Sequence, residues 1–467
     1  MNSSKLLLMP FKCACAGLLL LCSAGGTTLA AEPATSFTLA NGLQVVVLPD
    51  HRLPVVTHVL YYKAGSADDP PGQSGIAHFT EHLMFKGTAR YPTGQYDLIV
   101  NQAGGTNNAF TSDDKTYYFE QILKEGLPRI MELDADRMAG LDFAPAEAEH
   151  ELKVVLEERR TYQNDPESLL SEQAGYALYG RAPYAHPVLG EPAETDSLTK
   201  AAALAFHAQF YSPANAVLVV AGDVAPDDVK SLAMATYGQL AAGKGPQPRS
   251  WTHAAAACHQ GHTELRHERV PRDQVSIYFL TPGSATMSVQ TEAALHLLAD
   301  NLQDQGTSPL WHGLAGRAET ISDVAASFEL KLAAGEFTIT ATAEQGIGAK
   351  QLDALLQRGL VALRRDGINA QALAETKRHW LASQIFEADD QLAMATRYGE
   401  QLAIGRNVAE IEHEPEAIAA VTPGGVTAAI QDFLSTRCSV SAWLLQSGAP
   451  DASPVRSTAT HSTSALH

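Results

Sequence analysis

Residues 78–82 read His78-Phe79-Thr80-Glu81-His82, and this stretch decides how the rest of the chain is interpreted. On a helix, side chains four residues apart project from the same face, so His78 and His82 can present two imidazoles to one ion. Glu81 lies beside His82, close enough to act as a general base on a water at that ion without being a ligand. The order is the mirror of the commoner H-E-x-x-H zinc-binding helix. The stretch therefore predicts a helix that carries two zinc ligands and a catalytic glutamate.

A third ligand is expected on a second helix, residues 145–162, which begins with a proline at its first turn. This helix carries several carboxylates, namely Glu147, Glu149, Glu151, Glu157 and Glu158. A solvated acidic face would account for them. However, Glu151 and Glu158 are two turns apart on one face, beside the apolar Val154 and Val155, and carboxylates next to buried positions need a partner. Two imidazoles and one carboxylate leave one tetrahedral position for water, as catalytic zinc requires.

The segments around these helices predict an α+β fold. Runs rich in β-branched and aromatic residues predict strands in the first half at 37–47, as a hairpin turning at Asn41-Gly42, and at 55–62, 104–122 and 216–220. Residues 241–257 have no apolar periodicity and are interpreted as a linker.

Beyond the linker the order of elements starts again. Strands are predicted at 275–280, 324–332, 336–343 and 439–445, with helices at 287–302 and 349–364. The pattern indicates a divergent duplication into two homologous domains, residues 32–240 and 258–447. Each domain is expected to be a mostly antiparallel sheet with helices packed on one face, and only the first carries the metal motif.

Composition agrees with a large globular protein. A chain of 467 residues is too long for one ordinary core, and 45% hydrophobic with 18% charged residues excludes wholesale disorder. The formal net charge of −19 disfavours nucleic acid as a partner, and no basic stripe reverses this.

The N-terminal residues 1–30 have the pattern of a signal peptide. Lys5 and Lys12 precede a short apolar run at 14–24, and Thr28-Leu29-Ala30 supplies a small-x-small cleavage pattern. Since the run is too short to be retained as a membrane span, we expect export, to the periplasm if the source is bacterial.

Two other regions carry predictions of their own. The cysteines beyond the signal segment, Cys258 and Cys438, fit either a disulfide or two separate buried thiols. The tail at 448–467 is rich in Ser, Thr, Pro and Ala and is predicted to be disordered.

Taken together, motif and spacing resemble the pitrilysin family of inverted-motif zinc metallopeptidases, which includes insulin-degrading enzyme and the mitochondrial processing peptidases. That family has H-x-x-E-H followed some 75 residues later by a ligand glutamate in a helix, and 75 residues lie between His82 and Glu158 here. The resemblance implies a zinc site of His78, His82 and Glu158, with Glu81 as general base and Glu151 as an auxiliary glutamate that supports the ligands. Glu157 is a competing ligand candidate, but it points roughly 100° away around the helix.

The stretch 104–111, Gly-Gly-Thr-Asn-Asn-Ala-Phe-Thr, resembles the substrate edge strand of that family. The resemblance implies that Asn108, Ala109, Phe110 and Thr111 hold a peptide as an added strand through backbone hydrogen bonds. An ordinary sheet strand would show the same composition. We therefore expect a zinc endopeptidase for short or unfolded peptides, with two alternatives: a non-catalytic peptide-binding or scaffold subunit of this fold, and a metalloenzyme of another activity.

One stretch departs from the family pattern. Members that work alone supply an arginine and a tyrosine from the second half, in a stretch resembling L-R-x-x-x-G-L-A-Y, but here those positions are Ala315 and Ser322. Arg317 is two residues too far along, and Arg397-Tyr398 reads as an ordinary helix surface. The resemblance then implies the metal-bearing subunit of the two-subunit bacterial type, with a homologous partner subunit that supplies the arginine and the tyrosine. The alternative is a chain that works alone with Arg317 or another local donor.

Overall fold

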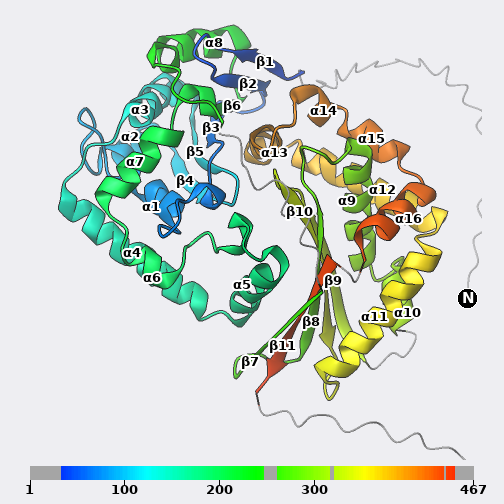
Figure 1. Ribbon diagram of the computed structural model, residues 1–467. Coiled ribbons are helices and arrows are strands. Elements are labelled where there is room, and N and C mark those ends of the chain that lie inside the picture. The colour runs from blue at the N-terminus through cyan, green and yellow to red at the C-terminus, as the bar shows by residue number, and fades with distance from the viewer. Residues whose placement is uncertain (1–32, 247–259, 316–319, 436–437, 448–467) are drawn as a thin grey trace, which may run out of the picture.

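The computed structural model describes residues 33–246, 260–315, 320–435 and 438–447, which form two halves with one sheet each (Figure 1). The signal segment, most of the linker, the tail, Cys258 and Arg317 lie outside the described residues. The first sheet contains β1 (Thr35–Thr38), β2 (Gln44–Pro49), β3 (Val55–Tyr62), β4 (Thr106–Thr111), β5 (Thr116–Leu123) and β6 (Ala216–Gly222). The second contains β7 (Gly261–His267), β8 (Gln274–Pro282), β9 (Ile321–Glu329), β10 (Ala334–Ala343) and β11 (Ser439–Gln446).

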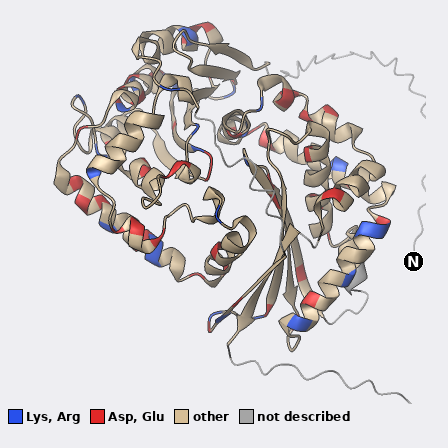
Figure 2. Ribbon diagram, in the orientation of Figure 1, with Lys and Arg blue, Asp and Glu red and all other residues tan. Residues whose placement is uncertain are grey.

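Helices occupy most of the intervening chain. The first half contains α1 (Ile76–Leu83), α2 (Gln95–Gln102), α3 (Leu127–Ala139), α4 (Pro145–Gln163), α5 (Pro166–Tyr179), α6 (Pro192–Thr195), α7 (Lys200–Phe210) and α8 (Pro226–Ala235). The second contains α9 (Val289–Gln303), α10 (Pro309–Ala315), α11 (Ala349–Asp366), α12 (Ala370–Glu387), α13 (Gln391–Ala403), α14 (Val408–Glu412), α15 (Glu414–Ala420) and α16 (Pro423–Phe433). Charged residues of both signs recur along α4 and α11 (Figure 2).

Strand order confirms the predicted duplication. The first sheet runs β1-β2-β6-β3-β5-β4 and the second runs β7-β11-β8-β10-β9, so the two orders coincide once the added β1 is set aside. In both sheets the first matched pair is parallel, β2 with β6 and β7 with β11, and the remaining pairs are antiparallel. The chain is therefore an α+β protein of two homologous domains.

Each sheet buries one face under helices of its own half. The core of the first half lies between its sheet and α1, α3 and α7, and that of the second lies between its sheet and α9, α11 and α16. The turn at Asn41-Gly42 is formed as predicted, with Gly42 at a φ of 92° that favours glycine.

The opposite face of each sheet is covered by a helix from the other half, which the sequence did not indicate. Helix α5 packs Ala174 and Leu178 against β11 of the second sheet. Helix α13 packs on β3 and β6 of the first sheet, where a Cβ at Gly399 would come within 1.9 Å of the Tyr61 ring. The prediction that Arg397-Tyr398 lies on an ordinary helix surface is therefore wrong, because Tyr398 is buried in this interface.

Several boundaries differ from prediction. Strand β9 begins at Ile321 and ends at Glu329, each three residues earlier than predicted. Strand β7 was missed because polar residues alternate along it and it lacks an apolar run. Cys438 is disulfide-bonded, and the partner that the sequence suggested, Cys258, is outside the described residues. Within the described ranges no helix has the length and apolar character that crossing a membrane requires.

Candidate metal centre and active site

Helix α1 is held at its start by a carboxylate from the preceding loop. The backbone N–H groups of Gly75 and Ala77 donate to Asp69 at 2.6 and 3.0 Å, so this carboxylate satisfies two of the donors at the start of the helix. Gly75 has a φ of 87°, which sets the sharp entry into the helix. Ile76, Phe79 and Leu83 pack into the core, and this leaves His78 and His82 on the side that faces α4.

Three predicted ligands converge between α1 and α4. Glu158 Oε2 lies 3.6 Å from His78 Nε2 and 3.4 Å from His82 Nε2, and the two imidazole rings are 4.7 Å apart between centroids. One ligand atom from each of the three residues lies within 4.8 Å of the others. Glu158 is half-exposed and the two histidines are largely buried, so the cluster opens to one side.

These positions fit a zinc ion. Ligands at about 2.0–2.1 Å in a tetrahedral arrangement stand roughly 3.3 Å apart, close to the two separations measured from Glu158. Burial lowers the pKa of His78 to about 4, so this imidazole is neutral and its Nε2 is able to bind a metal. Two nitrogens and one carboxylate oxygen are also the donor types that zinc takes in catalytic sites.

Glu157 is placed outside this cluster. Its side chain is 68% exposed and accepts a hydrogen bond from Arg160 Nη1 at 2.8 Å on the same helix. The structure thus separates the neighbouring glutamates as their angular offset on a helix predicts.

Glu151 lies behind His82. Its Oε1 is 2.9 Å from His82 Nδ1, and its Oε2 is 2.5 Å from Lys86 Nζ. Burial works against the charged form of His82, but Glu151 and Glu158 outweigh it and raise the pKa of His82 to about 9, so a metal at Nε2 would displace a proton there. The bond to Nδ1 holds the imidazole so that Nε2 faces the cluster.

Glu81 is buried beside the cluster and is held by the edge strand. Thr111 Oγ1 donates to Glu81 Oε2 at 2.6 Å. Burial raises the pKa of Glu81 to about 6, which brings this carboxyl close to neutral pH, where a general base is most effective. The predicted role of Thr111 in substrate binding concerns its backbone, and the structure adds that its side chain binds the candidate base.

The other residues of the predicted edge strand have varied surroundings. No strand pairs with the outer edge of β4 in the part of the chain that the structure describes. Ala109 packs into the core, whereas Phe110 is 50% exposed on the opposite face, its ring 5.5 Å from that of Tyr117. Asn108 accepts a hydrogen bond from the N–H of Ala109 through its own Oδ1. Strand β4, which contacts α1, thus ends the first sheet within the described residues.

In the second half, α9 takes the position of α1 but has no H-x-x-E-H motif. Ser322 lies on β9 with its hydroxyl 3.3 Å from the carbonyls of Thr342 and Ala343, within its own sheet. Arg397 donates to Glu414 at 2.6 Å and is committed to that contact. Arg317, the local donor named for a chain that works alone, lies outside the described residues.

A second group of possible metal ligands is internally balanced. His58, Glu120 and Asp134 are fully buried, with His58 Nδ1 2.8 Å from Glu120 Oε2 and 3.4 Å from Asp134 Oδ2. Burial opposes a charge on His58, but the two carboxylates outweigh it and raise its pKa. Arg137 pairs with Asp134, so two cations neutralise two anions without a metal. This group is best understood as part of the core.

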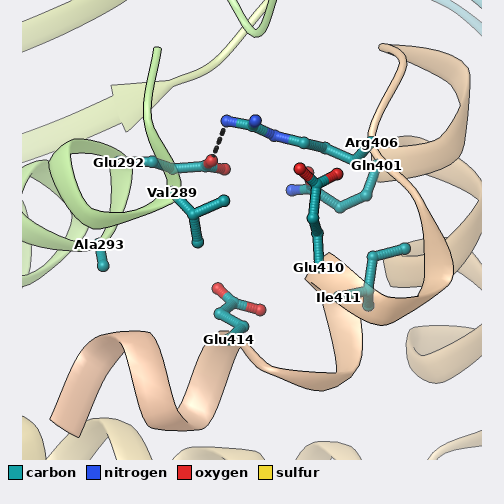
Figure 3. Close-up of a pocket in the computed structure, with 8 residues that line it drawn as sticks. All are labelled: Val289, Glu292, Ala293, Gln401, Arg406, Glu410, Ile411 and Glu414. Carbon is teal, nitrogen blue, oxygen red and sulfur yellow. Dashed lines mark hydrogen bonds and ion pairs between the residues drawn. The ribbon is translucent and has the colours of Figure 1, made fainter. Parts of the chain in front are cut away.

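A hollow of about 350 Å³, which includes open solvent, lies between α9, α13, α14 and α15 (Figure 3). Its charged groups are already engaged: Arg406 pairs with Glu292, Glu414 accepts from Arg397, and Glu410 caps the start of α14. The hollow has no metal-ligand geometry and does not compete with the cluster on α1 and α4.

Two homologous α+β halves, one of which places an inverted histidine–glutamate motif next to an open strand edge, define the metallopeptidase class that the resemblance had suggested. The chain belongs to peptidase family M16. Residues 44–191 match the family described as insulinase (peptidase family M16), and residues 197–379 match the peptidase M16 inactive domain.

Named relatives are consistent with this assignment. The zinc protease PqqE of Helicobacter pylori is 37% identical over 207 residues, which are 44% of this chain and 47% of that protein, so less than half of its length is matched. A protein of Mycobacterium bovis named as an uncharacterized zinc protease is 28% identical over 420 residues, 87% of this chain and 93% of that protein.

Solved structures share the fold. A protease from Helicobacter pylori superposes with a TM-score of 0.81 at 24% identity and covers 89% of this chain and 100% of its own. The periplasmic protease PqqL from Escherichia coli has a TM-score of 0.74 at 20% identity and covers 89% of this chain and 48% of its own.

Proposed function

We propose that this chain is a zinc-dependent endopeptidase that hydrolyses short or unfolded peptides held along β4. The observation that carries the proposal is the convergence of His78 Nε2, His82 Nε2 and Glu158 Oε2 within 4.8 Å of one another. Relatives named as zinc proteases support the same metal and the same reaction class.

In this proposal His78, His82 and Glu158 would hold the ion. A bound zinc ion supplies Lewis acidity, which polarises the scissile carbonyl and lowers the pKa of water to about 7. Glu81 takes the proton of the attacking water and returns it to the leaving amine. Glu151 keeps His82 oriented, and Thr111 keeps the Glu81 carboxylate aimed at the reacting atoms.

The substrate is proposed to bind as a strand added to the outer edge of β4. Main-chain hydrogen bonds give affinity with little demand on sequence, and they require an extended segment. Asn108 to Thr111 supply that edge, and Thr111 ends it beside Glu81. A folded protein has few free extended segments, so short or unfolded chains are the favoured substrates.

The test is metal analysis and peptide hydrolysis on the purified chain and two variants. His78→Ala should lose zinc together with activity, because it removes a ligand. Glu81→Gln should retain stoichiometric zinc and lose turnover, because it removes a base that is not a ligand. Full zinc content in His78→Ala, or normal turnover in Glu81→Gln, would contradict the proposal.

We further propose that full activity needs a homologous partner subunit that supplies an arginine and a tyrosine. Donors aimed at the tetrahedral oxyanion commonly contribute a factor of 10²–10³ in rate. The matching positions here are Ala315 and Ser322, and Ser322 is oriented toward its own sheet.

The peptidase rate of an equimolar mixture of this chain and the partner should exceed the rate of either protein alone by at least a factor of roughly 10²–10³. The partner to test is a family member that has the arginine and tyrosine but lacks H-x-x-E-H. Equal rates with and without it would favour the alternative, a chain that acts alone. An unchanged rate after replacement of the partner's arginine and tyrosine would likewise contradict the proposed role of the partner.

Export across the inner membrane, and thus a periplasmic location in a bacterium, is proposed from the pattern of residues 1–30. The intact mass of the protein from its native cell should correspond to a chain that begins at or near Ala31. A full-length species confined to the cytosol would contradict export.

A further inference from the structure

We propose that Lys86 is a positioning residue of the metal site, whose ammonium group holds Glu151 in the orientation that binds His82. This inference rests on the proposed zinc function and adds a residue to it. Three contacts form a continuous line: Lys86 Nζ to Glu151 Oε2 at 2.5 Å, Glu151 Oε1 to His82 Nδ1 at 2.9 Å, and His82 Nε2 to Glu158 Oε2 at 3.4 Å.

The backbone around Lys86 is fixed independently of this contact. Its N–H donates to Leu83 O at 3.0 Å, and its carbonyl accepts from Thr93 Oγ1 at 2.7 Å. The next residue, Gly87, has a φ of 115°, and a Cβ there would come within 2.7 Å of Tyr91 O. The turn that follows α1 is thus built so that Lys86 is directed back toward the helix pair rather than into solvent.

Burial makes the contact consequential. The side chain of Glu151 is only 9% exposed and that of Lys86 21%. Each carboxylate oxygen of Glu151 has one partner, so loss of the cation would leave Oε2 buried without compensation. The carboxylate would then turn or exchange partners, and the imidazole of His82 would lose the acceptor that fixes Nε2 toward the ion.

A plain structural role is the competing explanation, because a cation between α1 and α4 could simply stabilise their packing. The two roles differ in what they change. A positioning residue alters zinc affinity through Glu151, whereas a packing residue alters the stability of the metal-free protein and leaves the intrinsic affinity unchanged.

The experiment measures the zinc dissociation constant of the full chain by competition with a chelating dye. Variants are Lys86→Met, Lys86→Arg, Glu151→Gln and the double variant Lys86→Met/Glu151→Gln. Lys153→Met is the matched control, because Lys153 is exposed on α4 two residues from Glu151 and its substitution removes the same charge. Thermal unfolding of each metal-free variant reports on packing, and ¹⁵N NMR of the histidines reports the tautomer of His82.

Lys86→Met should weaken zinc binding about tenfold, the lower end of what is lost when a group behind a ligand is removed. Lys86→Arg should restore most of that affinity, and Lys153→Met should match the unmodified chain. In the Glu151→Gln background, Lys86→Met should have little further effect, because the cation acts through the carboxylate.

Unchanged zinc affinity in Lys86→Met overturns the inference. A double variant whose loss of zinc affinity equals the sum of the losses of Lys86→Met and Glu151→Gln also overturns it. Failure of Lys86→Arg to recover affinity in a protein that unfolds normally also overturns it, because the charge would then not be what matters. An unmodified chain that binds no zinc would instead refute the proposed function itself, so the two failures are distinguishable.

Discussion

The hydroxyl of Thr111 is predicted to be worth one to two orders of magnitude in turnover. Thr111 Oγ1 donates to Glu81 Oε2 at 2.6 Å, and it is the hydrogen-bond donor to this carboxylate among the described residues. A hydrogen bond to a charged group contributes about 1.5–3 kcal/mol, and each 1.4 kcal/mol is a factor of ten. Thr111→Val keeps the shape of the side chain but removes the donor. We therefore expect kcat to fall roughly 10- to 150-fold.

The assay is steady-state hydrolysis of an unstructured peptide, with zinc content measured on the same samples. Because Thr111 contacts the base and not a ligand, zinc should stay stoichiometric and KM should change little. Thr111→Ser retains the hydroxyl and is the matched control, which should keep most of the activity. A kcat for Thr111→Val within twofold of the serine variant would refute the reasoning. Loss of zinc in Thr111→Val would show that Thr111 supports metal binding rather than the orientation of the Glu81 carboxylate.

Three further predictions follow from contacts and burial in the structure. Glu158→Ala should empty the metal site while Glu157→Ala keeps it, and metal content of the two purified variants decides between the ligand candidates. Burial lowers the pKa of His207 from 6.5 to about 4, so the stability that its neutral form contributes is present above about pH 6.5 and is lost as the pH falls toward 4. Between these pH values the unfolding free energy of the unmodified chain should fall by up to about 3 kcal/mol more than that of His207→Gln, as measured by denaturant unfolding. The ion pair of Lys331 with Asp113, at 2.7 Å, joins the two halves, and Lys331→Met should cost about 1–3 kcal/mol of unfolding free energy, most of it absent when Asp113→Asn is already in place.

The sequence predicted elements whose signal is local. Strand β3 was placed at its observed residues and helix α4 to within one residue, because apolar periodicity and an N-terminal proline mark them. The separation of Glu158 from Glu157 also followed from helix geometry alone. The metal cluster was thus foreseeable once two helices were known to face each other, a step that came from family resemblance.

Contacts between distant elements were not foreseeable in the same way. Thr111 and Glu81 are thirty residues apart, and nothing in the composition of β4 distinguishes a threonine that binds a base from one that binds a peptide. Lys86 could have been noticed, since it follows His82 by four residues, but its carboxylate partner is on another helix. The crossing of α5 and α13 to the opposite sheets was missed because burial on both faces of a sheet depends on tertiary packing.

These crossings explain why a half without the metal motif is retained in the architecture. The face of β3 that carries Tyr61 is covered by α13, and Gly399 allows the helix to approach the ring closely. At the other end of the interface Lys331 binds Asp113, two residues beyond Thr111, so the second half also fixes the hairpin that positions the candidate base. Losing this ion pair should cost about 1–3 kcal/mol, and removing α13 would expose the apolar face of the first sheet. The contacts that the second half makes with the first are therefore burial of its sheet by α13 and anchoring of its hairpin by Lys331, whereas α9 carries no H-x-x-E-H motif.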